Sequence, residues 1–258
     1  MATPRRQGQD GAADGPDVSL VLPTYNERDN VLELLPLVFD VLAGRTHEVI
    51  VVDDGSPDGT ADAVRDFVAR GLPVRLVSRA QKEGIGAALR AGYAECRGRV
   101  IASMDADQSF DPRDLPRLLA RLDAGADLVV GTRHAVGGSY DAPTLKTRTK
   151  RLLSGVGNRV LRAVTGIPLT DYSGNLRVFR REVWDTIETA ENTNALLFEV
   201  ILHAYVAGFT VAEIPVAFRE RRYGVSKLHI SREAPRFLRR FWRLVRRHRA
   251  VIRLRRAR

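Results

Sequence analysis

The sequence has little cysteine, no long apolar run and no cluster of cysteines and histidines that could bind zinc. Cys96 is the single cysteine among 258 residues, so no disulfide can form within the chain, and no CxxC or Cys/His group has zinc-site spacing. A reducing, cytoplasmic environment is the default expectation for such a chain. The five histidines form no HxH or HxxxH pair, and we interpret them as structural or surface residues.

Apolar residues make up 44% of the chain, but no stretch approaches the roughly 18 consecutive apolar residues of a membrane-spanning helix. The first 16 residues are polar, rich in Gly, Asp and Arg, and lack the apolar core of a signal peptide. We expect residues 1–16 to be a disordered leader, residues 17–231 to form one globular domain, and residues 232–258 to form a basic tail.

Positive charge is concentrated in the last segment. The formal net charge is +10 at pH 7, and residues 236–258 contain 11 arginines with no Asp or Glu, so the rest of the chain carries −1. A basic segment of this kind serves nucleic acid, anionic lipid or a solvated surface, and charge alone does not choose among them.

Short apolar runs alternate with helical patterns from Val18 onward. The runs are continuously apolar, as in strands buried on both faces, and the segments between them carry apolar residues at three- and four-residue spacing. This alternation predicts an α/β fold with a doubly wound, mostly parallel sheet flanked by helices. The expected strands are 18–22, 48–52, 74–78, 99–104 and 127–131, and the expected helices are 30–42, 61–69, 86–96 and 115–122.

The regular alternation of strand and helix patterns ends after Gly131. We expect a loop over 137–143, a basic helix over 146–164, a mixed segment containing 171–181, a helix over 196–207 and a strand over 210–218. No internal repeat or low-complexity linker separates the two halves. We therefore expect the second half to continue the first and cover the sheet.

Carboxylates follow three of the expected strands. Ligands of an open parallel sheet bind at the carboxyl ends of its strands, where residues 23–27, 53–56, 105–107 and 132–133 stand. Asp105 and Asp107 can offer oxygen ligands to one hard cation, Mg²⁺ or Mn²⁺. Phosphate oxygens and water then complete the coordination sphere of the cation. Such a site holds a diphosphate. The first strand is not followed by GxGxxG, which argues against a dinucleotide dehydrogenase.

Five motifs occur in a fixed order: Pro23-Thr-Tyr-Asn-Glu27, Val52-Asp-Asp-Gly-Ser56 with Asp58-Gly-Thr60, Met104-Asp-Ala-Asp107, Gly131-Thr-Arg133 and Tyr223-Gly-Val-Ser-Lys227. Together they resemble the family 2 glycosyltransferases with the GT-A fold, and more narrowly the polyprenol (dolichol) phosphate mannose synthases. The resemblance runs from about Val18 to Leu228. Its most specific part is Arg221-x-x-Gly224-x-Ser226-Lys227. It implies that residues 17–231 are a GT-A glycosyltransferase domain.

The resemblance implies a nucleotide pocket built from the first two strand ends. Pro23, Tyr25 and Glu27 match residues that line the pocket in the family. Asp54, with Val52 beside it, matches a contact to the base or ribose. The alternative interpretation of any one of these residues, taken alone, is that it caps a helix or terminates a strand.

The resemblance also implies a metal site and a set of basic catalytic residues. Asp105 and Asp107 match the ligands of Mg²⁺ or Mn²⁺ that bridge to the donor diphosphate, and Ser109 occupies an auxiliary position. The expected catalytic residues are Asp107 and three basic residues around the phosphates, for which surface charge is the alternative: Arg133, Arg221 and Lys227.

The implied reaction is inverting transfer of mannose from GDP-mannose to a polyprenyl monophosphate. This acceptor is already an anion near neutral pH, so little general base is needed, and we name none. Where many family members read Asp-x-Thr-Ser-Gly-Phe-Arg, this chain has Asp171-Tyr-Ser-Gly-Asn-Leu-Arg177, which keeps UDP-sugars open as donors. Glu199 matches a family Glu near the site, or it is a buried charge paired with an arginine. A nucleotide-binding module without turnover is the further alternative.

The basic tail forms an amphipathic pattern when projected on a helix. We expect it to dock the enzyme peripherally on the cytoplasmic, inner face of the membrane, where the lipid acceptor resides. Packing on the catalytic domain or binding to a membrane-subunit partner are the alternatives. We expect no nucleic-acid partner, because strand-end carboxylates repel phosphate. The apolar side comprises Phe237, Leu238, Phe241, Trp242, Leu244, Val245, Val251 and Ile252.

Overall fold

The computed structural model describes residues 15–141, 145–219 and 230–256 of the chain. Its first half alternates strands and helices as the apolar pattern predicts, and each predicted element is found within two residues of its expected ends. The elements are β1 (Val18–Thr24), α1 (Arg28–Val41), β2 (His47–Asp53), α2 (Thr60–Ala69), β3 (Val74–Ser78), α3 (Ile85–Glu95), β4 (Val100–Ser103), the 3₁₀ turn η1 (Pro112–Asp114), α4 (Leu115–Asp123) and β5 (Leu128–Thr132).

The second half is richer in helix. It contains the predicted helices at 146–164 and 196–207, whereas the single strand predicted over 210–218 is two shorter strands in different sheets. It also contains short elements that the sequence pattern does not reveal, at 139–140, 177–180 and 181–186. The elements are β6 (Ser139–Tyr140), α5 (Leu145–Thr165), β7 (Arg177–Arg180), α6 (Arg181–Thr186), α7 (Ala195–Ala207), β8 (Val211–Pro215), β9 (Ala217–Phe218) and α8 (Ile230–Arg256).

The main sheet has seven strands in the order β3-β2-β1-β4-β7-β5-β8. Its pairs are parallel except for those of β7, which runs antiparallel to both β4 and β5. The mostly parallel sheet is therefore confirmed. The second half does more than cover the sheet, because it supplies two of its strands; β6 and β9 form a separate two-stranded sheet.

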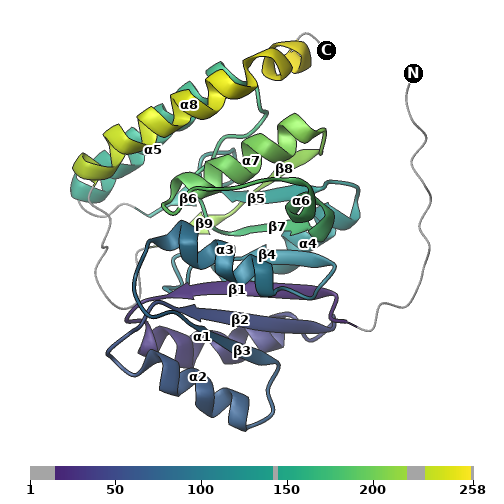
Figure 1. Cartoon of the computed structure of the whole chain (residues 1–258), viewed down its shortest axis with the longest axis vertical. Helices are drawn as coiled ribbons and strands as arrows, with labels where there is room; N and C mark the ends of the chain where they lie inside the picture. Colours follow the sequence, from purple (N-terminus) through teal and green to yellow (C-terminus); the bar gives the residue numbers. More distant parts are fainter. Residues whose placement is uncertain (1–14, 142–144, 220–229, 257–258) are drawn as a thin grey trace.

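Helices cover both faces of the main sheet, and the side chains of β1 alternate between the two resulting cores. Val21 packs in the core shared with α3, α7 and α8, whereas Leu20 and Leu22 pack in the core shared with α1 and α4. Gly92 of α3 is needed for this close packing, since a Cβ there would lie 2.4 Å from Val21 Cγ1. Figure 1 shows α1 and α2 at one end of the molecule and α5, α7 and α8 at the other.

The basic tail forms the helix α8, and part of its apolar side packs against α7, while Leu238 and Trp242 remain 51% and 46% exposed. Phe241 is 1% exposed, and its ring centroid lies 5.3 Å from that of Phe198. The reason is that α7 is apolar around nearly its whole circumference and needs a cover. Of the residues predicted to face lipid, four are buried: Phe241, Leu244, Val245 and Ile252. Packing on the globular domain, the stated alternative, is thus what the structure shows for these four residues.

Candidate active site

The carboxyl ends of the central strands lie at one edge of the sheet. Thr24 at the end of β1 pairs with Asp53 at the end of β2, and Ser103 at the end of β4 pairs with Val21 of β1. Because β7 is antiparallel, its first residue, Arg177, pairs with Ser103 at this same edge. The residues that follow β1, β2 and β4 and those that precede β7 are therefore brought together, as the strand-end argument predicts for the first three.

Hydrogen bonds order the loops after β1 and β2 and join them to each other. Asp53 Oδ2 accepts a hydrogen bond from Ser56 N at 3.0 Å, and Ser56 Oγ accepts one from Asn26 N at 2.9 Å. Glu27 Oε2 accepts one from Asn30 Nδ2 at 2.6 Å. Pro23 pairs with Val52 in the β1–β2 ladder. These contacts place the predicted pocket residues of the two strands side by side.

Asp54 faces basic side chains that the sequence interpretation missed. Its Oδ1 lies 2.7 Å from Arg79 Nη1, and the Asp54 side chain is 5% exposed. Burial raises the pKa of Asp54, with the charges of Arg79 and Lys82 opposing that rise. The Lys82 ammonium stands 4.3 Å from the centroid of the Tyr25 ring. Their position just after β3, another parallel strand, is the signal that points to Arg79 and Lys82.

Asp105 and Asp107 lie in the turn that follows β4. Asp107 is 4% exposed, and its Oδ1 accepts a hydrogen bond from Ser109 N at 3.0 Å. Gln108 closes the turn with a φ of 56°, a conformation uncommon outside glycine. Asp105 Oδ1 accepts a hydrogen bond from Asn175 Nδ2 at 3.0 Å. Within the part of the chain that the structure describes, no group of three or more His, Cys, Asp and Glu side chains is arranged to hold a metal.

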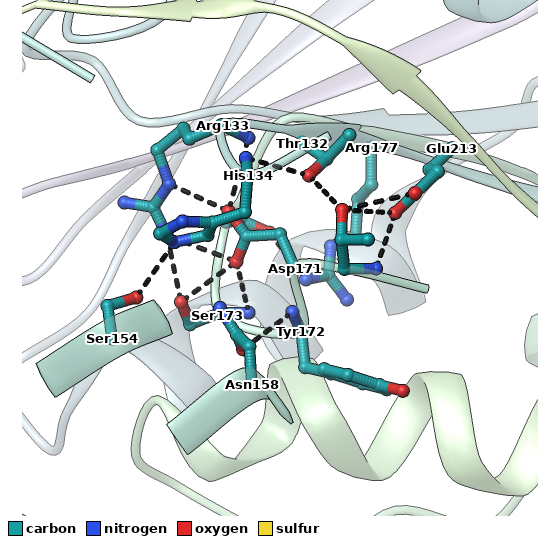
Figure 2. Close-up of polar contacts among 12 residues, drawn as sticks. Thr132, Arg133, His134, Ser154, Asn158, Asp171, Tyr172, Ser173, Arg177 and Glu213 are labelled. Carbon is teal, nitrogen blue, oxygen red and sulfur yellow. Dashed lines mark hydrogen bonds and ion pairs between the residues drawn. The ribbon is translucent and has the colours of Figure 1, made fainter. Parts of the chain in front are cut away.

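Arg133 follows β5 and forms a two-pronged ion pair with Asp171 (Figure 2). Its Nε lies 2.7 Å from Asp171 Oδ2 and its Nη2 lies 3.1 Å from Oδ1. Burial alone would raise the pKa of Asp171, but the charge and hydrogen bonds of Arg133 outweigh burial and lower it. Arg133 Cζ also stands 4.9 Å from the ring centroid of Phe218. Arg133 is thus at the predicted edge, with its guanidinium engaged by a carboxylate of the protein. Arg221 and Lys227 lie outside the described residues, as do residues 1–14 of the leader predicted over 1–16.

Two further charged residues fix the loop between α5 and β7. Arg177 is fully buried and donates to the carbonyl oxygens of Gly174 at 2.6 Å and Leu197 at 2.8 Å. Glu213 of β8 accepts a hydrogen bond from Thr170 N at 2.6 Å (Figure 2). Glu199 of α7 instead fixes the segment between α6 and α7, where it accepts from the backbone N–H groups of Ala190 at 3.2 Å and Glu191 at 3.1 Å.

The fold resembles that of solved sugar-nucleotide enzymes. A structure of glucosyl-3-phosphoglycerate synthase from Mycobacterium tuberculosis, in complex with Mn²⁺, UDP and phosphoglyceric acid, matches 91% of this chain and 78% of its own, with a TM-score of 0.67 and 20% identity. At that identity the likeness concerns the fold. Residues 19–187 match the family described as glycosyl transferase family 2. The chain belongs to glycosyltransferase family 2.

Two relatives refine the position of the chain within glycosyltransferase family 2. Polyprenol monophosphomannose synthase of Mycolicibacterium smegmatis is 39% identical over 223 residues, which cover 81% of this chain and 80% of the relative. Dolichol-phosphate mannosyltransferase of Pyrococcus furiosus is 31% identical over 214 residues, which cover 82% of this chain and 59% of the relative. The chain thus spans most of the first relative and little more than half of the second.

Proposed function

We propose that this glycosyltransferase transfers mannose from GDP-mannose to a polyprenyl monophosphate, with inversion at the anomeric carbon. The observation that carries the proposal is the gathering of Asp54, Asp105 and Asp107 at one sheet edge, in a chain that is 39% identical to a polyprenol monophosphomannose synthase. The basic side chains of Arg79 and Lys82 add positive charge beside that edge. A diphosphate with a sugar attached fits a site with these charges.

The carboxylate oxygens at the sheet edge suit a divalent cation. Asp105 and Asp107 offer hard carboxylate oxygens after one strand, and Mg²⁺ or Mn²⁺ takes one or two such carboxylates together with phosphate oxygens and water. When bound, the cation supplies positive charge to the diphosphate as it leaves. The backbone N–H of Ser109 orients Asp107, and the carboxamide of Asn175 orients Asp105.

The acceptor phosphate supplies the nucleophile. One of its anionic oxygens attacks the anomeric carbon, a carbon–oxygen bond forms there, and the bond from that carbon to the β-phosphate oxygen breaks and releases GDP. No proton has to be removed from the nucleophile, which is consistent with a site without a dedicated base. Arg221 and Lys227 are proposed to hold the two phosphate groups.

A panel of labelled sugar nucleotides tests this function. The full-length chain is incubated with Mg²⁺ or Mn²⁺, a short polyprenyl phosphate, and GDP-mannose, UDP-glucose or UDP-N-acetylglucosamine. We expect labelled lipid only with GDP-mannose. Product from a UDP-sugar alone would overturn the donor, and nucleotide binding without product from any donor would favour a binding module.

The acceptor is a lipid, and one helix presents a surface suited to an anionic membrane. Among the described residues, ten large hydrophobic side chains are exposed, and seven of them belong to α5 and α8. On α5 they form a stripe flanked by arginines of the same helix, which contains no Asp or Glu. The α5 stripe consists of Leu152, Leu153, Val156 and Val160, and its arginines are Arg148, Arg151, Arg159 and Arg162.

The opposite side of α5 contacts the candidate site. Asn158 Oδ1 accepts a hydrogen bond from Tyr172 N at 3.2 Å, and Ser154 Oγ lies 3.2 Å from His134 Nε2 (Figure 2). Tyr172 follows the ion-paired Asp171, so a membrane against the α5 stripe would be separated from the loop at the sheet edge only by the width of the helix, about 10 Å. We therefore propose peripheral docking on the cytoplasmic membrane face through α5, with the exposed arginines of α8 as a second basic surface. No helix in the described ranges combines the length and apolar character of a membrane span.

Charged substitutions in the α5 stripe should weaken membrane binding. We expect Leu152→Glu with Val156→Glu to reduce binding to phosphatidylglycerol vesicles by at least about tenfold, because two exposed apolar side chains are lost and two negative charges are added. Leu32→Glu on α1 is the matched control, since Leu32 is 39% exposed and α1 lies at the other end of the molecule. Sedimentation with vesicles at low salt measures the effect. Equal binding by the stripe variant and the control would contradict docking through α5.

A further inference from the structure

Asn175 joins Asp105 to a chain of buried side chains behind the sheet edge. Its Nδ2 lies 3.0 Å from Asp105 Oδ1, and its Oδ1 lies 3.0 Å from Ser103 Oγ. The hydroxyl of Tyr93, on α3, lies 2.8 Å from the same Ser103 oxygen. Asn175 is 2% exposed, Ser103 is fully buried and Tyr93 is 1% exposed. These contacts lie away from water and hold the carboxamide from both ends.

The chemistry of the groups fixes the direction of each hydrogen bond. An ionised carboxylate only accepts, so the carboxamide nitrogen has to face Asp105 and its oxygen has to face Ser103. Ser103 then donates its single hydroxyl proton to Asn175, which leaves Tyr93 to donate to Ser103. Burial raises the pKa of Tyr93 to about 12, so the phenol keeps the proton that it donates. The chain of donors therefore stabilises a single orientation of the carboxamide.

The antiparallel strand explains how Asn175 reaches Asp105. Asn175 stands two residues before Arg177, and Arg177 pairs with Ser103 at the end of β4. A parallel strand would enter the sheet at the opposite edge, far from the turn that carries Asp105. Asn175 also belongs to the loop in which this chain departs from the family pattern, Asp171-Tyr-Ser-Gly-Asn-Leu-Arg177.

We propose that Asn175 is a positioning residue that holds the Asp105 carboxylate in one rotamer for the divalent cation of the donor complex. The inference rests on the proposed metal site. A hydrogen bond to one carboxylate oxygen restricts rotation of the group. Partners of this kind behind metal ligands contribute about 10- to 100-fold in metal affinity.

The test measures Mn²⁺ binding to the full-length chain by electron paramagnetic resonance, with and without GDP. We expect Asn175→Ala to raise the Mn²⁺ Kd about tenfold and to leave the GDP affinity without metal unchanged. Ser19→Ala is the control, because Ser19 is also fully buried and hydrogen-bonded, but its contacts with Glu48, Arg97 N and Gly98 N lie near the start of β1, at the opposite edge of the sheet. Its Mn²⁺ Kd should equal that of the wild type. Asp105→Asn serves as the reference for loss of the site.

The outcomes separate the two proposals. An unchanged Mn²⁺ Kd in Asn175→Ala, with Asp105→Asn defective, would overturn the role of Asn175 alone. Equal Mn²⁺ binding by the wild type and Asp105→Asn would overturn the metal site, and the inference with it. If Asn175→Ala does not fold, Ser103→Ala decides, since it removes only the hydroxyl that orients the carboxamide. We expect that variant to weaken Mn²⁺ binding less than Asn175→Ala, and an unchanged Kd would overturn the inference.

Discussion

Asp107→Asn is expected to lower kcat for sugar transfer by about 100-fold or more, because it removes the charge that we propose holds the cation against the leaving diphosphate. The fold should survive the substitution. Asp107 is buried, and its Oδ1 accepts a hydrogen bond from Ser109 N at 3.0 Å, a role that the amide oxygen of asparagine can keep. Turnover of GDP-mannose with polyprenyl phosphate measures kcat, and thermal unfolding checks that the fold is retained.

Asp111→Asn is the control in the same loop. Asp111 caps the turn η1 through a 3.0 Å hydrogen bond from Arg113 N to its Oδ1, and asparagine caps helices about as well as aspartate. This variant should keep the kcat of the wild type. Wild-type turnover by Asp107→Asn in excess chelator would remove Asp107 from the metal site.

The second large effect concerns stability. Asp171→Ala should lower the free energy of unfolding by about 3–5 kcal/mol, because it leaves the buried guanidinium of Arg133 without its carboxylate. The Asp171 side chain is fully buried, the Arg133 side chain is 10% exposed, and the two are joined by two hydrogen bonds. Urea unfolding followed by circular dichroism measures the difference between variant and wild type.

Asp62→Ala is the matched control, because Asp62 pairs with Arg65 while both side chains are more than half exposed. It should change the free energy of unfolding by less than about 1 kcal/mol. The stabilising effect of Asp171 also depends on pH. Its pKa is below the usual value in the folded chain, so its contribution is present above about pH 4 and is lost as the pH falls further. An equal loss of unfolding free energy in Asp171→Ala and Asp62→Ala would show that the buried ion pair contributes no more to stability than the exposed one.

Apolar patterning predicts the first half of this fold well because its strands are buried on both faces. The strand over 74–78 is found at the predicted residues, and the other four differ by one or two residues at their ends. The pattern fails at β7, Arg177–Arg180, which has two apolar residues between arginines. Arg177 is an unexpected strand residue, since it is fully buried and donates to the carbonyl oxygens of Leu197 in α7 and of Gly174 in the preceding loop.

The candidate site likewise contains some residues that the sequence predicts and others that it does not. The neighbouring positions of Glu27, Asp54 and Asp105 follow from the rule for strand ends in parallel sheets, so a reading of the chain finds them. The position of Arg79 directly after the predicted strand over 74–78 follows from the same rule, although the sequence interpretation missed it. The contact of Asn175 with Asp105 joins residues 70 positions apart. It depends on where β7 enters the edge, and no local pattern encodes that. The tail could not be assigned either, because an amphipathic helix fits lipid and α7 equally well.

The position of β7 between β4 and β5 also determines the order in which the sheet can be completed during synthesis. The strands β1 to β4 form a paired set as soon as Ser103 has emerged, but β5 has no neighbour within the first half, since both of its partners, β7 and β8, come later in the chain. The edge that carries Asp105 and the strand that carries Arg133 are therefore joined only after about 45 further residues have left the ribosome, counted from the end of β5. Until then β5 has no partner strand on either side, and its second side is paired only when β8 follows. Unpaired strand edges favour association with other chains, so we expect the nascent chain to be most prone to aggregation before β7 and β8 have emerged.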